Sequence, residues 1–141
     1  MDEHKVVKER IIQASIMEVW KAVTNADEMS QWFFEIADFR PELGFEFQLV
    51  GEKDGKEYST SCKIIEVVER EKLVFTWRYD DFPGEQLVAF ELIDMGESCK
   101  FRVTHSGLEK MLAEQDEFDI EDTIDGWEVL TQQLKQLVEG S

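Results

Sequence analysis

The sequence has few cysteines that could cross-link a small protein and no long apolar segment that could hold it in a membrane. It holds only two cysteines, Cys62 and Cys99, among 141 residues. Small secreted domains that depend on disulfides usually carry more, so the cysteine content favours the reducing cytoplasm. No apolar run approaches the roughly 18 residues that a membrane-spanning helix needs, and residues 1–5 show no signal-peptide pattern. We therefore expect a soluble, cytoplasmic protein without membrane insertion.

Positive charge is scarce as well. There are 15 Lys and Arg residues against 32 Asp and Glu residues, and the formal net charge is −17. Such a charge repels nucleic-acid phosphates and anionic lipid head groups, so we expect no nucleic-acid partner. The acidity indicates solubility above all, and it would also suit a protein partner with a basic surface.

Motifs for metal or nucleophilic chemistry are missing from the sequence. The two cysteines lack Cys-x-x-Cys spacing, and two histidines, His4 and His105, do not complete a zinc set. Counted from Asp119, the sixth and twelfth positions of a calcium loop hold Ile124 and Leu130 instead of Gly and Glu. There is no Gly-x-Ser-x-Gly elbow and no glycine-rich phosphate loop. We expect no metal, no cofactor and no catalytic residue, and the sequence leans away from an enzyme.

Two short helices are predicted near the start of the chain. Residues 6–12 read as a strand, and the Ser15–Glu18 pair that follows matches a capping box. Apolar residues then recur at three- and four-residue spacings, which indicates one buried helix face. Asn25 and Glu28 mark a second helix start, and that helix ends near residues 32–34.

The middle of the chain predicts an antiparallel meander. Alternating apolar and polar residues mark strands near 45–50, 58–68, 72–79, 86–93 and 99–105, with turn signals at 51–56, 80–84 and 94–97. After an acidic segment at 113–125, an apolar stripe predicts a helix over 123–139. This order predicts one α+β domain over residues 1–141, in which a curved antiparallel sheet of six to seven strands surrounds a long C-terminal helix.

Four segments carry a resemblance to a known family. They are ERIIQASIMEVWKAVTNADEMSQWF, IIEVVEREKLVFTW, FRVTHSGL and GWEVLTQQLKQLVE. In this order they resemble the START-like helix-grip superfamily (SRPBCC), and within it the domain named after the activator of the ninety-kilodalton heat-shock protein ATPase. The resemblance implies a seven-stranded sheet gripping the last helix, around a cavity that in this superfamily often holds lipids, sterols, polyketides or other apolar molecules. The eukaryotic activator has an additional N-terminal domain that contributes to chaperone binding, and we expect none in these 141 residues.

The aromatic alternation and the resemblance together predict a binding cavity between the last helix and the concave sheet. Its candidate lining residues are Trp32, Phe47, Trp77, Phe90, Phe101, His105, Trp127 and Leu130. Most would offer apolar contact, and each tryptophan adds one N–H donor, although ordinary core packing would also bury them. His105 would orient a polar ligand end, or it is a strand-end histidine satisfied by a neighbouring group.

Three functions are consistent with this pattern. The first is non-catalytic binding of an apolar small molecule, either lipid-like or aromatic. The second is a chaperone-associated interaction domain of the stress response, acting through its acidic surface and weakened by salt. The third is a cavity enzyme, such as a cyclase or hydrolase, which would use His105 with a perturbed titration or a buried carboxylate.

Overall fold

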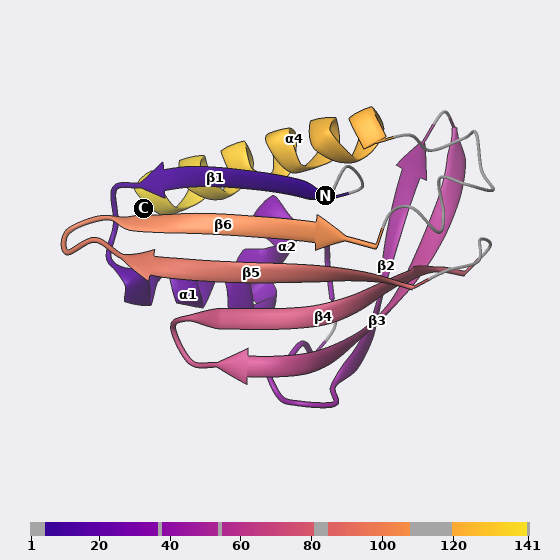
Figure 1. Cartoon of the computed structure of the whole chain (residues 1–141), viewed down its shortest axis with the longest axis horizontal. Helices are drawn as coiled ribbons and strands as arrows, with labels where there is room; N and C mark the ends of the chain where they lie inside the picture. Colours follow the sequence, from indigo (N-terminus) through magenta and orange to yellow (C-terminus); the bar gives the residue numbers. More distant parts are fainter. Residues whose placement is uncertain (1–4, 37, 54, 81–84, 108–119, 141) are drawn as a thin grey trace.

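The chain folds into six strands and three helices within the residues described by its computed structural model, namely 5–36, 38–53, 55–80, 85–107 and 120–140. In chain order they are β1 (Val6–Ile12), α1 (Ile16–Thr24), α2 (Ala26–Trp32), β2 (Glu46–Lys53), β3 (Lys56–Val68), β4 (Lys72–Tyr79), β5 (Gln86–Asp94), β6 (Cys99–Ser106) and α4 (Ile120–Glu139). Figure 1 shows the strands side by side, with α4 along one edge. The predicted α+β order is confirmed.

One antiparallel sheet holds all six strands, in the order β1-β6-β5-β4-β3-β2. Its curvature has a local cause in β3. Ile64 pairs with Phe75, and Glu66 pairs with Val74, so Ile65 is an extra residue without a partner of its own on β4. Such a bulge bends and twists its strand. Beyond it, β2 and β3 turn away from the direction of β5 and β6 (Figure 1).

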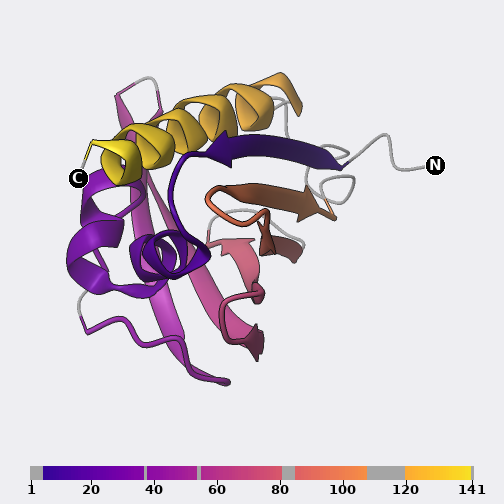
Figure 2. The same cartoon turned by 90° about the vertical axis from the view of Figure 1, so that its left-hand side faces the viewer.

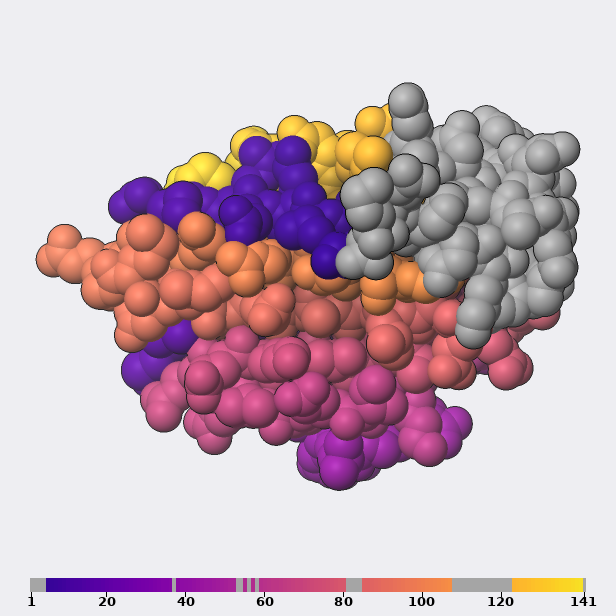
Figure 3. Space-filling model, viewed as in Figure 1, coloured from indigo at the N-terminus to yellow at the C-terminus, as the bar shows by residue number. Residues whose placement is uncertain are grey.

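The three helices lie on the same side of this sheet. Figure 2 shows α4 running alongside β1, with α1 and α2 inside the curve of the strands. No helix of the described residues covers the opposite face of the sheet, and the coloured strands of that face form much of the surface seen in Figure 3. The sheet is therefore packed on its concave face, as the helix-grip prediction requires.

Polar side chains fix where the first two helices begin. The Ser15 hydroxyl accepts from the Glu18 N–H at 3.3 Å, and the Asn25 side chain accepts from the Glu28 N–H at 3.1 Å. Asn25 has an extended backbone (φ −94°, ψ 127°), which separates α1 from α2. Both predicted caps are confirmed, because each side-chain oxygen satisfies an N–H that the helix itself leaves unpaired.

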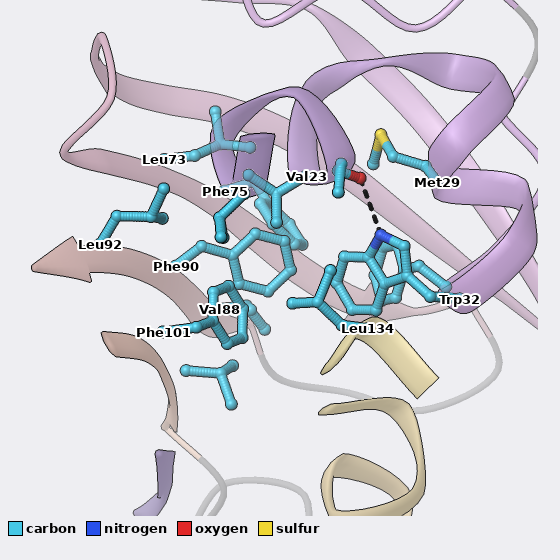
Figure 4. Close-up of a cluster of buried hydrophobic side chains, with 14 of the residues drawn as sticks. Val23, Met29, Trp32, Leu73, Phe75, Val88, Phe90, Leu92, Phe101 and Leu134 are labelled. Atoms are coloured by element: carbon cyan, nitrogen blue, oxygen red, sulfur yellow. Dashed lines mark hydrogen bonds between the residues drawn. The ribbon is translucent and has the colours of Figure 1, made fainter. Parts of the chain in front are cut away.

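The centre of the core lies between α1, α2, α4 and the sheet (Figure 4). Trp32, Phe90, Phe101 and Leu134 are at most 1% exposed there. The Trp32 indole N–H donates to the Ala22 carbonyl at 2.8 Å, the dashed line in Figure 4. This bond satisfies a donor that would otherwise be buried without a partner.

Polar contacts also join the last helix to the first strand. The Arg10 Nε donates to the Thr131 hydroxyl at 3.1 Å, and the Lys135 ammonium donates to the Ile11 carbonyl at 2.7 Å. Since β1 is an edge strand of the sheet, α4 covers an edge that could otherwise pair with another chain. Neither α4 nor any other helix in the described ranges has the length and apolar character that a membrane crossing requires.

Two element boundaries differ from the sequence prediction. Helix α4 begins at Ile120 rather than near residue 123, because the acidic residues that follow Ile120 suit the positive end of a helix. The turn predicted over 51–56 is tighter, since β2 runs to Lys53 and β3 starts at Lys56. Gly55, with a φ of +79°, adopts the left-handed conformation that so short a turn favours. Residues 113–119 of the acidic segment lie outside the described residues.

Candidate functional site

The eight predicted lining residues all lie in the core or against it. Seven are buried, and Leu130 on α4 is partly buried and packs on the core. A central group consists of Trp32, Phe90 and Phe101. Phe47 lies apart from it on β2. A third group, where β4 meets the first half of α4, consists of Trp77, His105 and Trp127, and Leu130 follows Trp127 on α4.

The central group packs as ordinary core. The ring centroids of Phe90 and Phe101 are 5.3 Å apart, and Trp32 lies 5.8 Å from Phe90 and 6.2 Å from Phe101. These are the tilted and edge-on contacts that aromatic rings prefer in protein interiors. Phe47 is in similar contact with Phe75 at 5.4 Å. These residues therefore supply an aromatic wall, and the Trp32 N–H is already occupied by Ala22.

The third group, Trp77, His105 and Trp127, contains the nitrogen atoms that make this part of the interior polar. The His105 ring lies 5.1 Å from Trp77 and 6.1 Å from Trp127, and the two tryptophans are 6.0 Å apart. Trp77 comes from β4, His105 from β6 and Trp127 from α4. The grouping thus brings together residues up to 50 positions apart in the chain.

Hydrogen bonds define the tautomer of His105. The Trp127 Nε1 donates to the His105 Nδ1 at 3.0 Å, and an indole nitrogen can only donate. Nδ1 is therefore the unprotonated acceptor, and the ring proton sits on Nε2. Nε2 then donates to the Gln86 side-chain oxygen, 2.6 Å away. His105 links the sheet to the last helix, and both of its ring nitrogens are engaged.

Burial also controls the charge of this histidine. His105 is 2% exposed, and desolvation lowers its pKa to about 3. The ring is neutral near pH 7, and it offers neither a free lone pair nor a proton-exchanging group at that pH. The geometry therefore gives little support to an acid–base role, or to direct ligand contact through His105 without displacing Gln86 or Trp127.

Gln86 is a site residue that the sequence analysis did not single out. It is 1% exposed and pairs with Trp77 across β4 and β5. The signal was present, because Gln86 shares the inward parity of Val88 and Phe90 in the same strand. Gly107 allows the strand ends to approach, since a Cβ there would lie 3.2 Å from the Gln86 Cα.

Trp77 differs from the other two tryptophans of the predicted lining. Its side chain is 7% exposed, and its Nε1 has no hydrogen-bond partner among the residues that the structure describes. A buried, unpaired N–H costs about 1–3 kcal/mol relative to a paired one. Trp77 therefore presents an unused donor beside His105 and Trp127.

The surroundings of this donor carry no formal charge. The buried polar residues in the described part of the chain are Thr60, Gln86, His105 and Thr131, and none of them is ionised near pH 7. Nor do three or more His, Cys, Asp or Glu side chains gather there in a way that could hold a metal ion. A charged group brought into this interior would lack a counter-ion, which is unfavourable at low dielectric.

Both cysteines are free thiols inside the protein. Burial raises the pKa of Cys62 far above its ordinary value and that of Cys99 to about 11. Because the thiolate is the reactive form, neither residue is activated as a nucleophile.

A curled antiparallel sheet closed by a C-terminal helix, with two short helices after the first strand, defines a helix-grip domain. Residues 13–139 match the family described as activator of Hsp90 ATPase homolog 1-like protein, and the chain belongs to that family. The sequence matches none of the curated proteins with which it was compared.

Solved structures show the same fold. Protein CV1439 from Chromobacterium violaceum superposes with a TM-score of 0.83 at 18% identity, covering 96% of this chain and 97% of that one. BH1534 from Bacillus halodurans superposes with a TM-score of 0.76 at 28% identity, with 96% of each chain covered. DynU16, a protein in the dynemicin biosynthetic locus, superposes with a TM-score of 0.80 at 21% identity, covering 97% of this chain and 48% of its own.

Proposed function

We propose that this protein binds a neutral, largely apolar small molecule between the first half of α4 and the inner face of β4–β6, without catalysing a reaction. The ligand would place a hydrogen-bond acceptor, such as a carbonyl oxygen, on the Trp77 Nε1. The proposal rests above all on this buried donor, which has no partner among the described residues.

The energetics of the unpaired donor support an acceptor-bearing ligand. Pairing the Trp77 N–H would recover part of the penalty of leaving it unsatisfied, about 1–2 kcal/mol, or roughly 5- to 30-fold in affinity. The Trp32 and Trp127 donors offer no such gain, because they are bonded to Ala22 and His105. Specificity for an oxygen atom at one position would follow.

The rest of the surroundings supports a neutral and aromatic ligand. Trp127 and His105 lie within ring-contact distance of Trp77, so flat rings could stack or meet them edge-on. No buried cation in the described chain would balance a carboxylate. Burying an uncompensated charge costs several kcal/mol, so we expect anionic ligands to be excluded from this site.

A matched pair of probes tests the proposal. Fluorenone and fluorene share one tricyclic skeleton and differ in a carbonyl, and fluorene-9-carboxylate adds a charge. In titrations followed by NMR, we expect the native protein to bind fluorenone roughly tenfold more tightly than fluorene and to reject the carboxylate. Trp77→Phe should abolish the preference for fluorenone. Trp32→Phe should keep it while lowering stability, because it leaves the Ala22 carbonyl unpaired.

Native mass spectrometry of protein purified from its own host provides a broader test. An extractable apolar molecule is the expected result. If neither this extraction nor soaking with lipid, sterol and flavonoid libraries yields a ligand, the proposal that the protein binds an apolar small molecule is wrong. A fluorenone preference that survives in Trp77→Phe would show instead that ligands bind without the Trp77 donor.

The family and the charge favour a second candidate. We propose, as an alternative, that the acidic surface docks on a basic surface of a chaperone of the ninety-kilodalton class. The supporting observations are the family match over residues 13–139 and the net charge of −17. Such binding should be strong at about 0.02 M salt and lost at about 0.5 M. A pull-down with the host chaperone that stays empty at low salt excludes this alternative.

A further inference from the structure

A hollow lies outside the core, on the outer face of α1. Its volume is about 340 Å³, and it is open to solvent. Helix α1, the loop before β2 and the turn between β3 and β4 contribute to it. Its lining includes Met17, Trp20, Lys21, Glu69 and Arg70.

The apolar part of the hollow comes mainly from α1. Trp20 is partly buried and packs on the hydrophobic core, which holds the ring in place. Met17, three residues earlier on α1, is 63% exposed, so its apolar side chain is available to a ligand in the hollow. Covering Met17 and the accessible part of Trp20 would remove apolar surface from water, which is favourable.

Two cations meet at this apolar surface. The Lys21 ammonium lies 3.3 Å from the Glu28 carboxylate, and the Arg70 Nε lies 4.0 Å from that of Glu69. No other carboxylate in the described ranges comes within ion-pair distance of Arg70. By contrast, the Arg102 Nε lies only 2.6 Å from its partner, the Glu9 carboxylate. The guanidinium of Arg70 is therefore held only loosely by Glu69, and it can donate hydrogen bonds to an external anion.

The backbone at Arg70 supports a role for its side chain. Its φ is 65°, in the left-handed region that favours glycine. The turn closes through a bond from the Glu71 N–H to the Val68 carbonyl at 2.9 Å. Glycine would suit this turn better, yet the position carries a long cationic side chain that lines the hollow. Strained backbone of this kind is often retained where the residue serves a site.

We propose that this hollow binds a small aromatic carboxylate, with its ring against Trp20 and Met17 and its carboxylate on Arg70 and Lys21. A guanidinium can bind a carboxylate through two parallel hydrogen bonds, and the ammonium adds a second charge. The volume is at the lower end of ligand sites, which suits one or two fused rings. This site is independent of the inner site at Trp77, and it prefers the charged ligands that the inner site excludes.

Naphthalene-2-carboxylate and the neutral 2-naphthamide are suitable probes, because they share one ring system. In NMR titrations of the full chain, we expect the carboxylate to shift the Trp20 indole and Arg70 Nε–H signals, with a dissociation constant of about 0.1–1 mM. The amide should bind roughly tenfold more weakly. Arg70→Gln should lower the affinity for the carboxylate by about tenfold, and Lys21→Gln should lower it by less. Arg78→Gln, outside the hollow, should leave the affinity unchanged.

Arg70→Gly separates binding from stability. It removes the cation and relieves the left-handed backbone, so we expect a higher melting temperature together with lost binding. Asp38→Gly is the matched control, since Asp38 also has a positive φ (56°) but does not line the hollow, and it should keep binding. Equal affinities for carboxylate and amide, unchanged affinity in Arg70→Gln, or shifts confined to Trp77 and Trp127 would each overturn the proposal. The last result would place the ligand in the inner site instead.

Discussion

At the scale of single residues, one hydrogen bond decides what a buried aromatic group can do. Trp32, Trp77 and Trp127 have the same side chain and similar burial, yet two indole donors are bonded inside the protein and one has no partner in the described chain. His105 shows the same principle, because Gln86 and Trp127 together fix its tautomer. Whether a buried tryptophan can donate a hydrogen bond to a ligand therefore depends on whether its N–H is already bonded inside the protein.

The neutral His105 predicts a pH dependence of stability. Its folded-state pKa of about 3 lies below the value of 6.5 for an exposed histidine, so the unfolded chain binds the proton more readily. The stability contribution is complete above about pH 6.5 and is lost as the pH falls toward 3. Between about pH 7.5 and pH 5, we expect a loss of roughly 2 kcal/mol from this group.

Denaturant unfolding of the native protein and of His105→Gln, at several pH values in this range, measures that loss. The variant is expected to be less stable overall but to show a shallower pH dependence. Equal slopes for the two proteins would mean that His105 is more readily protonated in the folded state than its burial indicates.

At the scale of elements, residue patterns predicted the fold because they are local. Strand alternation and helical spacing can be read within ten residues, and the capping residues Ser15 and Asn25 are next to the helices that they start. The stripe of α4 was predicted from spacing alone, and its members Trp127, Leu134 and Val138 are buried. The curvature was expected from general sheet behaviour, but the bulge at Ile65 that produces it has no strong sequence signal.

The candidate site was predicted only in part, because its chemistry depends on partners distant in the chain. Strand alternation and helical spacing indicated the inward positions, and the eight candidate residues lie in the core or against it, while their role as a ligand lining stays a prediction. Which donor remains unpaired did not follow, because the Trp127 partner, His105, lies 22 positions away on another element. The hollow at Arg70 was missed for the same reason, since helix α1 and the β3–β4 turn meet only in the folded chain.

The packing of α4 on the sheet predicts unequal effects of two substitutions in one helix. Leu134 is fully buried, so Leu134→Ala should destabilise the protein by about 2–5 kcal/mol through lost burial and a residual cavity. Val129 is 54% exposed, and Val129→Ala should change stability by about 0.5 kcal/mol or less. Chemical denaturation measures both values. Similar losses for the two variants would contradict the assignment of the inner and outer faces of α4.

At the scale of the whole molecule, negative charge outweighs the ion pairs. Lys8 and Arg10 both pair with Glu128, and Arg102 pairs with Glu9, so these cations already have carboxylate partners. With 32 acidic residues against 15 basic ones, most carboxylates have no matching cation. Their mutual repulsion destabilises the compact state, although it also keeps molecules apart.

This repulsion predicts that added salt stabilises the protein. Raising sodium chloride from about 0.01 M to about 0.5 M near pH 7.5 should screen the carboxylates and add roughly 1 kcal/mol, or about 3 °C in melting temperature. The same addition near pH 4.4, the sequence isoelectric point, should have little effect because the net charge is close to zero. Thermal unfolding checks both conditions, and a fall in melting temperature with salt near pH 7.5 would show that local ion pairs dominate instead.

The contact between the first strand and the last helix has a consequence during protein synthesis. The Gln13 N–H donates to the Glu139 carboxylate at 2.8 Å, across 126 positions of sequence, and Arg10 reaches Thr131 across 121. At about 5–20 residues per second, the ribosome takes roughly 6–25 s to produce α4 after β1 has emerged. β6 is made partway through that interval, but β1 lacks α4 until its end, so the domain cannot complete its fold before α4 has emerged. Its nascent chain therefore passes through a long phase as a potential client of ribosome-associated folding factors.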